Sequence, residues 1–130
     1  MAGEIVIFIT SPSREEAKRL GFHLVSEGLA ACVNIVPGLI SLFRWEGRLH
    51  EEKEFLLIVK TRTSSFKKLE KRVRELHSYS VPEVIGLPIV QGSKPYLQWV
   101  RAMTLPKKTM TRSHGSSRSK AEKVHKGNRD

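Results

Sequence analysis

The chain has 130 residues, with 23 Lys and Arg against 13 Asp and Glu, and a single cysteine. This length is typical of one domain, and one cysteine excludes an intramolecular disulfide framework. No apolar run approaches the roughly 18 residues that a membrane helix needs, and the N-terminal residues lack the features of a signal peptide. We therefore predict a cytoplasmic protein without membrane contact.

The positive charge is concentrated at the C-terminal end. Residues 107–130 hold eight Lys or Arg and two acids, a net charge of 8 − 2 = +6, and contain no Leu, Ile, Phe, Trp or Tyr. Such a segment cannot bury enough apolar surface to offset its ordering entropy. We predict a folded domain at residues 1–106 and a basic disordered tail at 107–130, which is either a solubilising extension or a salt-sensitive contact for nucleic acid or another acidic partner.

The first predicted unit is a strand followed by a helix. Residues 4–10 are a continuous β-branched and aromatic run, which is typical of a buried strand. Ser13 and Glu16 then fit a capping box, in which each side chain accepts a hydrogen bond from a first-turn amide. Apolar residues recur at helical spacing as far as Gly28, a plausible helix stop.

Two long strands are predicted next, at residues 30–45 and 49–60, on either side of a turn at 46–48. Pro37 and Gly38 interrupt the first strand, and a Pro-Gly pair inside a long strand indicates a bulge. Each arm is longer than a typical strand of about five or six residues. The pattern therefore predicts an overlong antiparallel hairpin.

A second helix is predicted to begin at Ser64 or Ser65 and to end no later than Pro82, because its apolar residues recur at helical spacing. Residues 83–90 predict a strand, in which Pro88 indicates an edge or bulge position. A short final helix is predicted to reach residue 103. The order is β-α-β-β-α-β plus a terminal helix, an α+β fold of the ferredoxin-like type with two helices on one face of a four-stranded antiparallel sheet.

The other face of such a sheet is bare in a monomer. A bare sheet face and an overlong hairpin are both surfaces that association with another chain would cover. The sequence therefore favours an oligomer.

The segment 77–83 is the best candidate for a functional site. We expect His77 to be exposed where the second helix ends, with Glu83 at the mouth of the last strand. Imidazole and carboxylate suit a divalent metal such as Zn or Cu(II), but two donors do not close a site. A neighbouring subunit would have to supply the rest. The alternative is that His77 only stabilises the helix C-terminus.

Six further residues are candidates for a pocket or a subunit interface. Lys60 ends an apolar strand and either extends into solvent or faces an anion in a polar cleft. Cys32 is either an inert core thiol or shares an interface side with Asn34. Aromatic residues complete the candidate set, and the tryptophans have core packing as their alternative: Cys32, Trp45, Lys60, Tyr79, Tyr96 and Trp99.

The sequence lacks the catalytic and nucleotide-binding motifs that we looked for as signs of an enzyme. There is no nucleophile triad with supporting spacing, no GxxxxGK[ST] loop and no GxGxxG loop. RNA-recognition modules of this fold need aromatic and basic residues on one strand, whereas residues 55–59 are aliphatic after the first. We predict that the protein is not an enzyme, requires no cofactor and contacts nucleic acid only through its tail.

Six short patterns occur in a distinctive order: AACVNIVPG (30–38), WEG (45–47), KTR (60–62), HSYSVPEV (77–84), LPI (87–89) and YLQW (96–99). Together they resemble the CutA divalent-cation-tolerance family over residues 5 to about 104. The resemblance implies a cytoplasmic homotrimer that responds to metal ions and binds a divalent metal such as copper weakly between subunits.

This chain departs from the family at two positions. Family members discussed as copper binders carry a thiol where this chain has Ile9 and a second histidine where it has Leu76. Of that set only His77 is retained. Two alternatives remain. The protein is either a trimer that senses a small ligand, such as an anion, or a protein that binds nucleic acid or acidic partners through its basic tail.

Overall fold

The structure, a computed structural model, describes residues 3–104. The predicted tail at 107–130 lies outside these residues. The described elements, in chain order, are β1 (Glu4–Ser11), α1 (Arg14–Ser26), β2 (Cys32–Trp45), β3 (Arg48–Arg62), the short 3-10 helix η1 (Thr63–Ser65), α2 (Phe66–Leu76), β4 (Val84–Pro88) and α3 (Lys94–Met103). The strands form one sheet in the order β2-β3-β1-β4, and every neighbouring pair is antiparallel. The predicted element order and the antiparallel sheet are confirmed.

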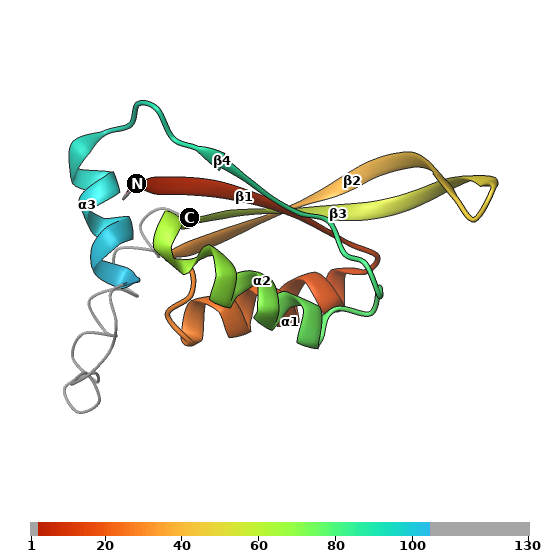
Figure 1. The fold of residues 1–130 in the computed structure, drawn as a ribbon, viewed down its shortest axis with the longest axis horizontal. Coiled ribbons are helices and arrows are strands. Elements are labelled where there is room, and N and C mark those ends of the chain that lie inside the picture. Colours follow the sequence, from red (N-terminus) through yellow and green to blue (C-terminus); the bar gives the residue numbers. More distant parts are fainter. Residues whose placement is uncertain (1–2, 105–130) are drawn as a thin grey trace.

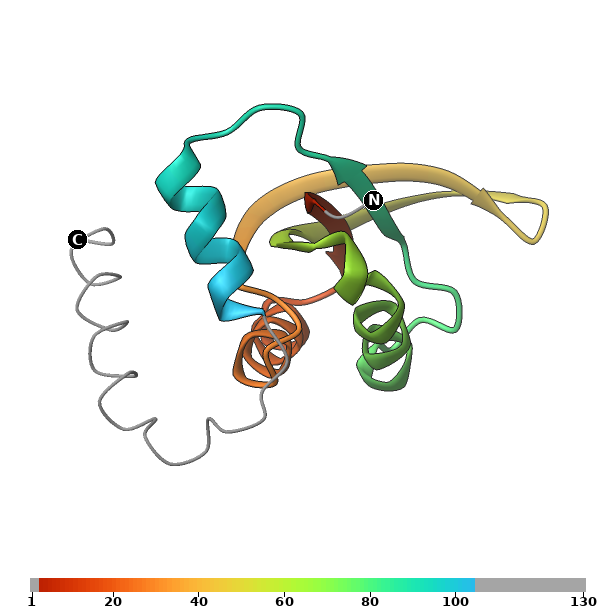
Figure 2. The ribbon, with the colours of Figure 1, turned by 60° about the vertical axis from the view of Figure 1, so that its left-hand side comes forward.

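The hydrophobic core lies between the sheet and the two helices α1 and α2, which cover the same face (Figures 1 and 2). Strand alternation explains this face, because the odd-numbered residues of β1 and β3 point toward the helices. The side chains that meet there are aliphatic and have almost no exposed surface: Ile7, Ile9, Leu20, Leu24, Leu57, Val59, Leu69 and Val73. Ile9, which stands where copper-binding relatives are expected to carry a thiol, is thus a core residue.

The start of α1 confirms only half of the predicted capping box. The Ser13 hydroxyl accepts a hydrogen bond from the Glu16 amide at 3.1 Å. The Glu16 carboxylate does not return to Ser13, but accepts from the Ser78 amide at 3.0 Å. The carboxylate is drawn away because a loop distant in sequence offers it a partly buried donor.

The β2–β3 hairpin is as long as the sequence predicts, with strands of 14 and 15 residues. The register shifts between Val36 and Leu39, which confirms the predicted bulge, and Gly38 has a φ of 87°. At the tip, Glu46 and Gly47 have φ angles of 52° and 74°, the positive pair that a tight two-residue hairpin turn requires. The hairpin extends well beyond the helices in Figure 1.

The face of the sheet opposite the helices is apolar and open. Its side chains include Phe8, Ile58 and Ile85, which lie in one row across β1, β3 and β4. Ile85 and Leu87, both on this face, are 49% and 42% exposed. Helix α3 lies at the end of the sheet away from the hairpin tip (Figure 1). None of the helices within residues 3–104 is long and apolar enough to span a membrane.

Candidate functional site

His77 begins the loop that follows α2, but its side chain is not exposed as we expected. The imidazole has no exposed surface. Its Nε2 lies 2.7 Å from the Thr10 carbonyl oxygen, and its Nδ1 accepts a hydrogen bond from the Tyr79 amide at 3.0 Å. Nδ1 also lies 3.2 Å from the Glu16 carboxylate. The prediction of an exposed imidazole is wrong because β1, α1 and the loop itself surround the ring. Both ring nitrogens are engaged within the protein.

Tyr79 connects the loop after α2 to the hairpin. Its hydroxyl donates a hydrogen bond to the Glu54 carboxylate at 2.6 Å, and its ring lies 4.8 Å from that of His77. Burial, and then the Glu54 carboxylate, raise the pKa of Tyr79, so the phenol keeps its proton and remains a donor. The chain of contacts His77–Tyr79–Glu54 therefore fixes the loop against β3.

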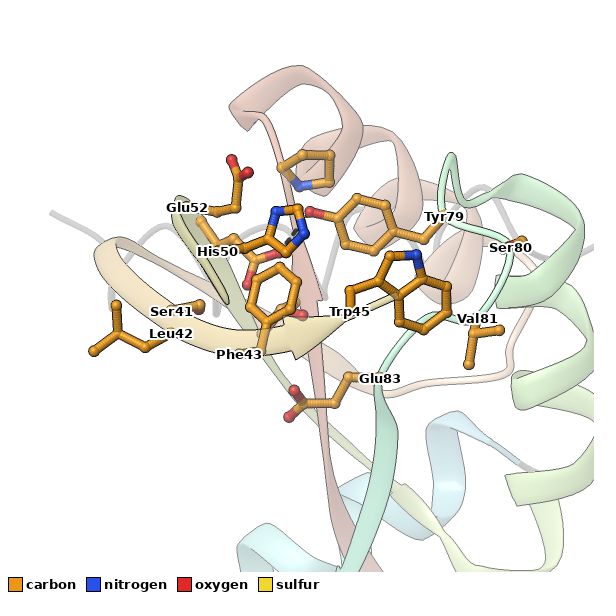
Figure 3. A pocket seen from close by; sticks show the side chains of 13 residues that line it. Ser41, Leu42, Phe43, Trp45, His50, Glu52, Tyr79, Ser80, Val81 and Glu83 are labelled. Carbon is orange, nitrogen blue, oxygen red and sulfur yellow. Dashed lines mark hydrogen bonds between the residues drawn. The ribbon is translucent and has the colours of Figure 1, made fainter. Parts of the chain in front are cut away.

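A cavity of about 710 Å³ lies beside this contact, between the loop and the outer part of the hairpin near its tip. Alternation along β3 places His50, Glu52 and Glu54 on the same side of the strand, the side opposite the core. Figure 3 shows the rings of Phe43, Trp45, His50 and Tyr79 together, with Glu83 apart from them, directly before β4. The described lining residues are Thr10, Pro12, Ser41, Leu42, Phe43, Trp45, His50, Glu52, Glu54, Tyr79, Ser80, Val81 and Glu83. This cavity is called the hairpin pocket below.

One carboxylate of the hairpin pocket is affected by burial and by a neighbouring acid. Partial burial raises the pKa of Glu83, and the charge of Glu54 raises it further. Neither carboxylate forms an ion pair with a residue between 3 and 104. No group of three or more His, Cys, Asp or Glu in this part of the chain is arranged to hold a metal ion. One chain thus supplies acidic groups for a cation but not a complete metal site.

The other predicted pocket residues gather elsewhere. Cys32 and Lys60 are direct partners across β2 and β3, and the Lys60 amine contacts the Asn34 side-chain oxygen. Burial, and then Cys32, raise the pKa of Tyr96 to about 12, and the Tyr96 ring lies 5.6 Å from that of Trp99. Cys32 is half-buried on the open face rather than enclosed in the core.

The predicted site residues therefore form two groups within one chain. Trp45, Tyr79 and Glu83 line the hairpin pocket, whereas the group around Cys32 and Lys60 lies on the open face near α3. We did not predict four of the residues that line the pocket: Phe43, His50, Glu52 and Glu54. An available signal was the i, i+2 spacing of His50, Glu52 and Glu54, which puts three polar side chains on one side of a strand.

Comparison with known proteins identifies the family. The model of the CutA1 divalent ion tolerance protein family matches residues 5–103. A divalent-cation tolerance protein CutA of Thermus thermophilus is 54% identical over 101 residues, which are 78% of this chain and 98% of that protein. A CutA of Arabidopsis thaliana described as chloroplastic is 50% identical over 77% of this chain, but the match spans only 55% of that protein.

Solved structures agree with these sequence matches. The structure of a periplasmic divalent cation tolerance protein CutA from Archaeoglobus fulgidus is similar with a TM-score of 0.76 and 41% identity, covering 78% of this chain and 99% of that one. The words chloroplastic and periplasmic describe those relatives, so the cytoplasmic location of this chain stays a prediction. Sequence, fold and coverage agree, and the chain belongs to the CutA1 divalent ion tolerance family.

Proposed function

We propose that this protein is a non-enzymatic trimer that binds a divalent metal such as copper weakly in clefts between its subunits, in a role in metal tolerance. The observation that carries the proposal is the hairpin pocket, where Glu54 and Glu83 face one cavity without an ion-pair partner among residues 3–104. The names of the relatives support the role in tolerance. We place the domain responsible at residues 1–106, which contain the family match.

The donor chemistry favours a shared metal site over one within a single chain. Two carboxylates attract a divalent ion but do not complete its coordination. His50 is the imidazole that lines the same pocket, so it is a better placed nitrogen donor than His77, whose nitrogens contact Thr10 and Tyr79. Further donors would come from a neighbouring subunit, and such a partial set is consistent with weak binding.

The trimer is supported by the surfaces that a single chain leaves open. Ile40, Leu42 and Leu49 on the hairpin are 64%, 73% and 78% exposed, and Ile85 on the open face is 49% exposed. Soluble monomers rarely display large apolar patches, and association with other subunits would cover these side chains. Sedimentation equilibrium tests this step, since a monomer at micromolar concentration would remove both the trimer and its clefts.

The metal site is tested by calorimetric titration of Cu(II) and Zn(II) into the wild type and three variants. Glu54→Gln and Glu83→Gln should each weaken binding, because each removes a negative charge from the pocket. Glu51→Gln, on the other side of β3, should leave the affinity unchanged and serves as the matched control. Equal affinities for all four proteins would overturn the hairpin pocket as the metal site.

A second candidate function is the binding of a small anion on the open face. The Lys60 amine lies there beside Asn34, with Tyr96 close to Cys32. No carboxylate of residues 3–104 pairs with Lys60. A trimeric sensor of a small anionic ligand would lose affinity for that ligand on Lys60→Met, whereas metal binding at the hairpin pocket would persist.

A further inference from the structure

Beside its acidic groups, the hairpin pocket has an aromatic wall. The rings of Phe43 and His50 stack with their centroids 5.3 Å apart and their planes at 11°. Trp45 and Tyr79 line the same cavity, and Figure 3 shows the four rings gathered around it. Trp45 is 48% exposed. Aromatic faces attract cations through their negative quadrupole, and they offer an apolar surface to an alkyl chain.

The charges of the pocket have a single sign. Its described lining residues include three glutamates and no Lys or Arg. Elsewhere in residues 3–104, four acids form ion pairs with Arg or Lys, whereas three others are unpaired but exposed to solvent: Glu4, Glu27, Glu70 and Glu75 are paired, and Glu15, Glu46 and Glu51 are not. Glu52, Glu54 and Glu83 have no such partner within these residues. Three unpaired acids thus meet at the aromatic wall, and one of them, Glu54, is buried.

Glu54 is the acid of the pocket that most needs a positively charged partner. It is only 5% exposed, and among the described residues only the Tyr79 hydroxyl donates a hydrogen bond to its carboxylate. A buried carboxylate is costly unless an opposite charge or several hydrogen bonds compensate it. A cation in the pocket would supply that compensation.

We propose that the hairpin pocket binds an organic ammonium ion, an alkylamine whose N–H groups bind Glu54 and Glu83 while its chain lies against Trp45 and Phe43. The inference rests on the proposed function only in using the same carboxylates. It differs in the aromatic wall, since the Trp45 and Phe43 rings stabilise an alkylammonium but provide no ligand to a divalent metal.

The test is a calorimetric titration of spermidine into the full chain at pH 8. We expect Glu54→Gln to weaken spermidine binding about tenfold or more, because it removes a buried partner of the ammonium group. Trp45→Leu should weaken it by about threefold to thirtyfold, because it removes a cation–π face and apolar contact. Glu51→Gln removes the same charge from the other side of β3 and should have little effect.

Several outcomes would overturn the inference. Spermidine affinity that Trp45→Leu leaves unchanged would show that the wall is not used. A loss on Glu51→Gln equal to that on Glu54→Gln would show general attraction to an acidic hairpin. Each variant is first checked for fold and assembly by circular dichroism and sedimentation. Glu83→Gln, at an exposed position, replaces Glu54→Gln if the latter does not fold.

Titration of Cu(II) and Zn(II) into the same variants separates this inference from the proposed function. Metal binding without spermidine binding would overturn the ammonium site and leave the metal proposal standing. Spermidine binding without metal binding would overturn the metal proposal and leave the ammonium site standing. Where both bind, we expect Trp45→Leu to weaken spermidine alone, and equal weakening of both ligands would overturn the assignment of the wall to the ammonium ion.

Discussion

Replacing His77 by alanine separates a structural role from a metal-ligand role. The imidazole is fully buried, and it forms contacts with Thr10 and Tyr79 through its two nitrogens. We expect His77→Ala to destabilise the fold strongly and to leave the affinity for Cu(II) and Zn(II) within about twofold, a change of about 0.4 kcal/mol.

The magnitude follows from the groups that the substitution leaves behind. The Thr10 carbonyl and the Tyr79 amide would each lose a hydrogen bond, of 2.7 Å and 3.0 Å respectively. An unsatisfied buried polar group costs about 1–3 kcal/mol, so the two together cost about 2–6 kcal/mol. Loss of the ring contact with Tyr79, at 4.8 Å between centroids, adds to this. Water that enters the vacated space would bring the result toward the lower value.

The assay is guanidinium denaturation at one fixed protein concentration, since association couples to apparent stability. The matched control is His23→Ala. His23 is 33% exposed and pairs with Glu27 on the surface of α1, so its loss should cost no more than about 1 kcal/mol. If His77→Ala matched the stability of the control and abolished metal binding, the structural role would be refuted and His77 would be a ligand.

Three further predictions concern the surfaces around this site. Ile40→Glu on the exposed hairpin should produce monomers in sedimentation, whereas Phe22→Glu, at a residue of α1 that is 70% exposed, should not; an intact oligomer in the first variant would contradict the hairpin interface. Burial and Glu54 raise the pKa of Glu83, so the folded state holds the Glu83 carboxyl proton more tightly than the unfolded state does. The free energy of unfolding therefore falls as the pH rises through the range in which Glu83 loses this proton. The denaturation midpoint of Glu83→Gln should therefore exceed that of the wild type by more at pH 7 than at pH 4. An equal difference at both pH values would contradict this prediction. Deletion of residues 107–130 should abolish retention on DNA or RNA at low salt if the basic tail is the contact, and unchanged retention would place binding on the domain.

The element order was accessible from the sequence because it depends on local chemistry. The apolar run of β1, the Pro37-Gly38 interruption and the helical periodicity of α1 and α2 are each encoded within a few residues. Strand alternation also predicts that Cys32 and Asn34 share a side, and the structure brings both into contact with the group around Lys60. These features require no knowledge of which distant segments meet.

The candidate site depended on contacts between distant segments. The burial of His77 arises because β1 and α1 close around a loop that follows α2. Thr10 and His77 are 67 positions apart in the sequence, and no periodic signal indicates their contact. The pairing of Tyr79 with Glu54 likewise joins a loop to a strand 25 positions earlier. The sequence by itself determined the order of elements, the open sheet face and the long hairpin. Only the tertiary structure decided that His77 is enclosed and that an acidic, aromatic pocket forms beside it, because burial and charge proximity depend on packing across the whole domain.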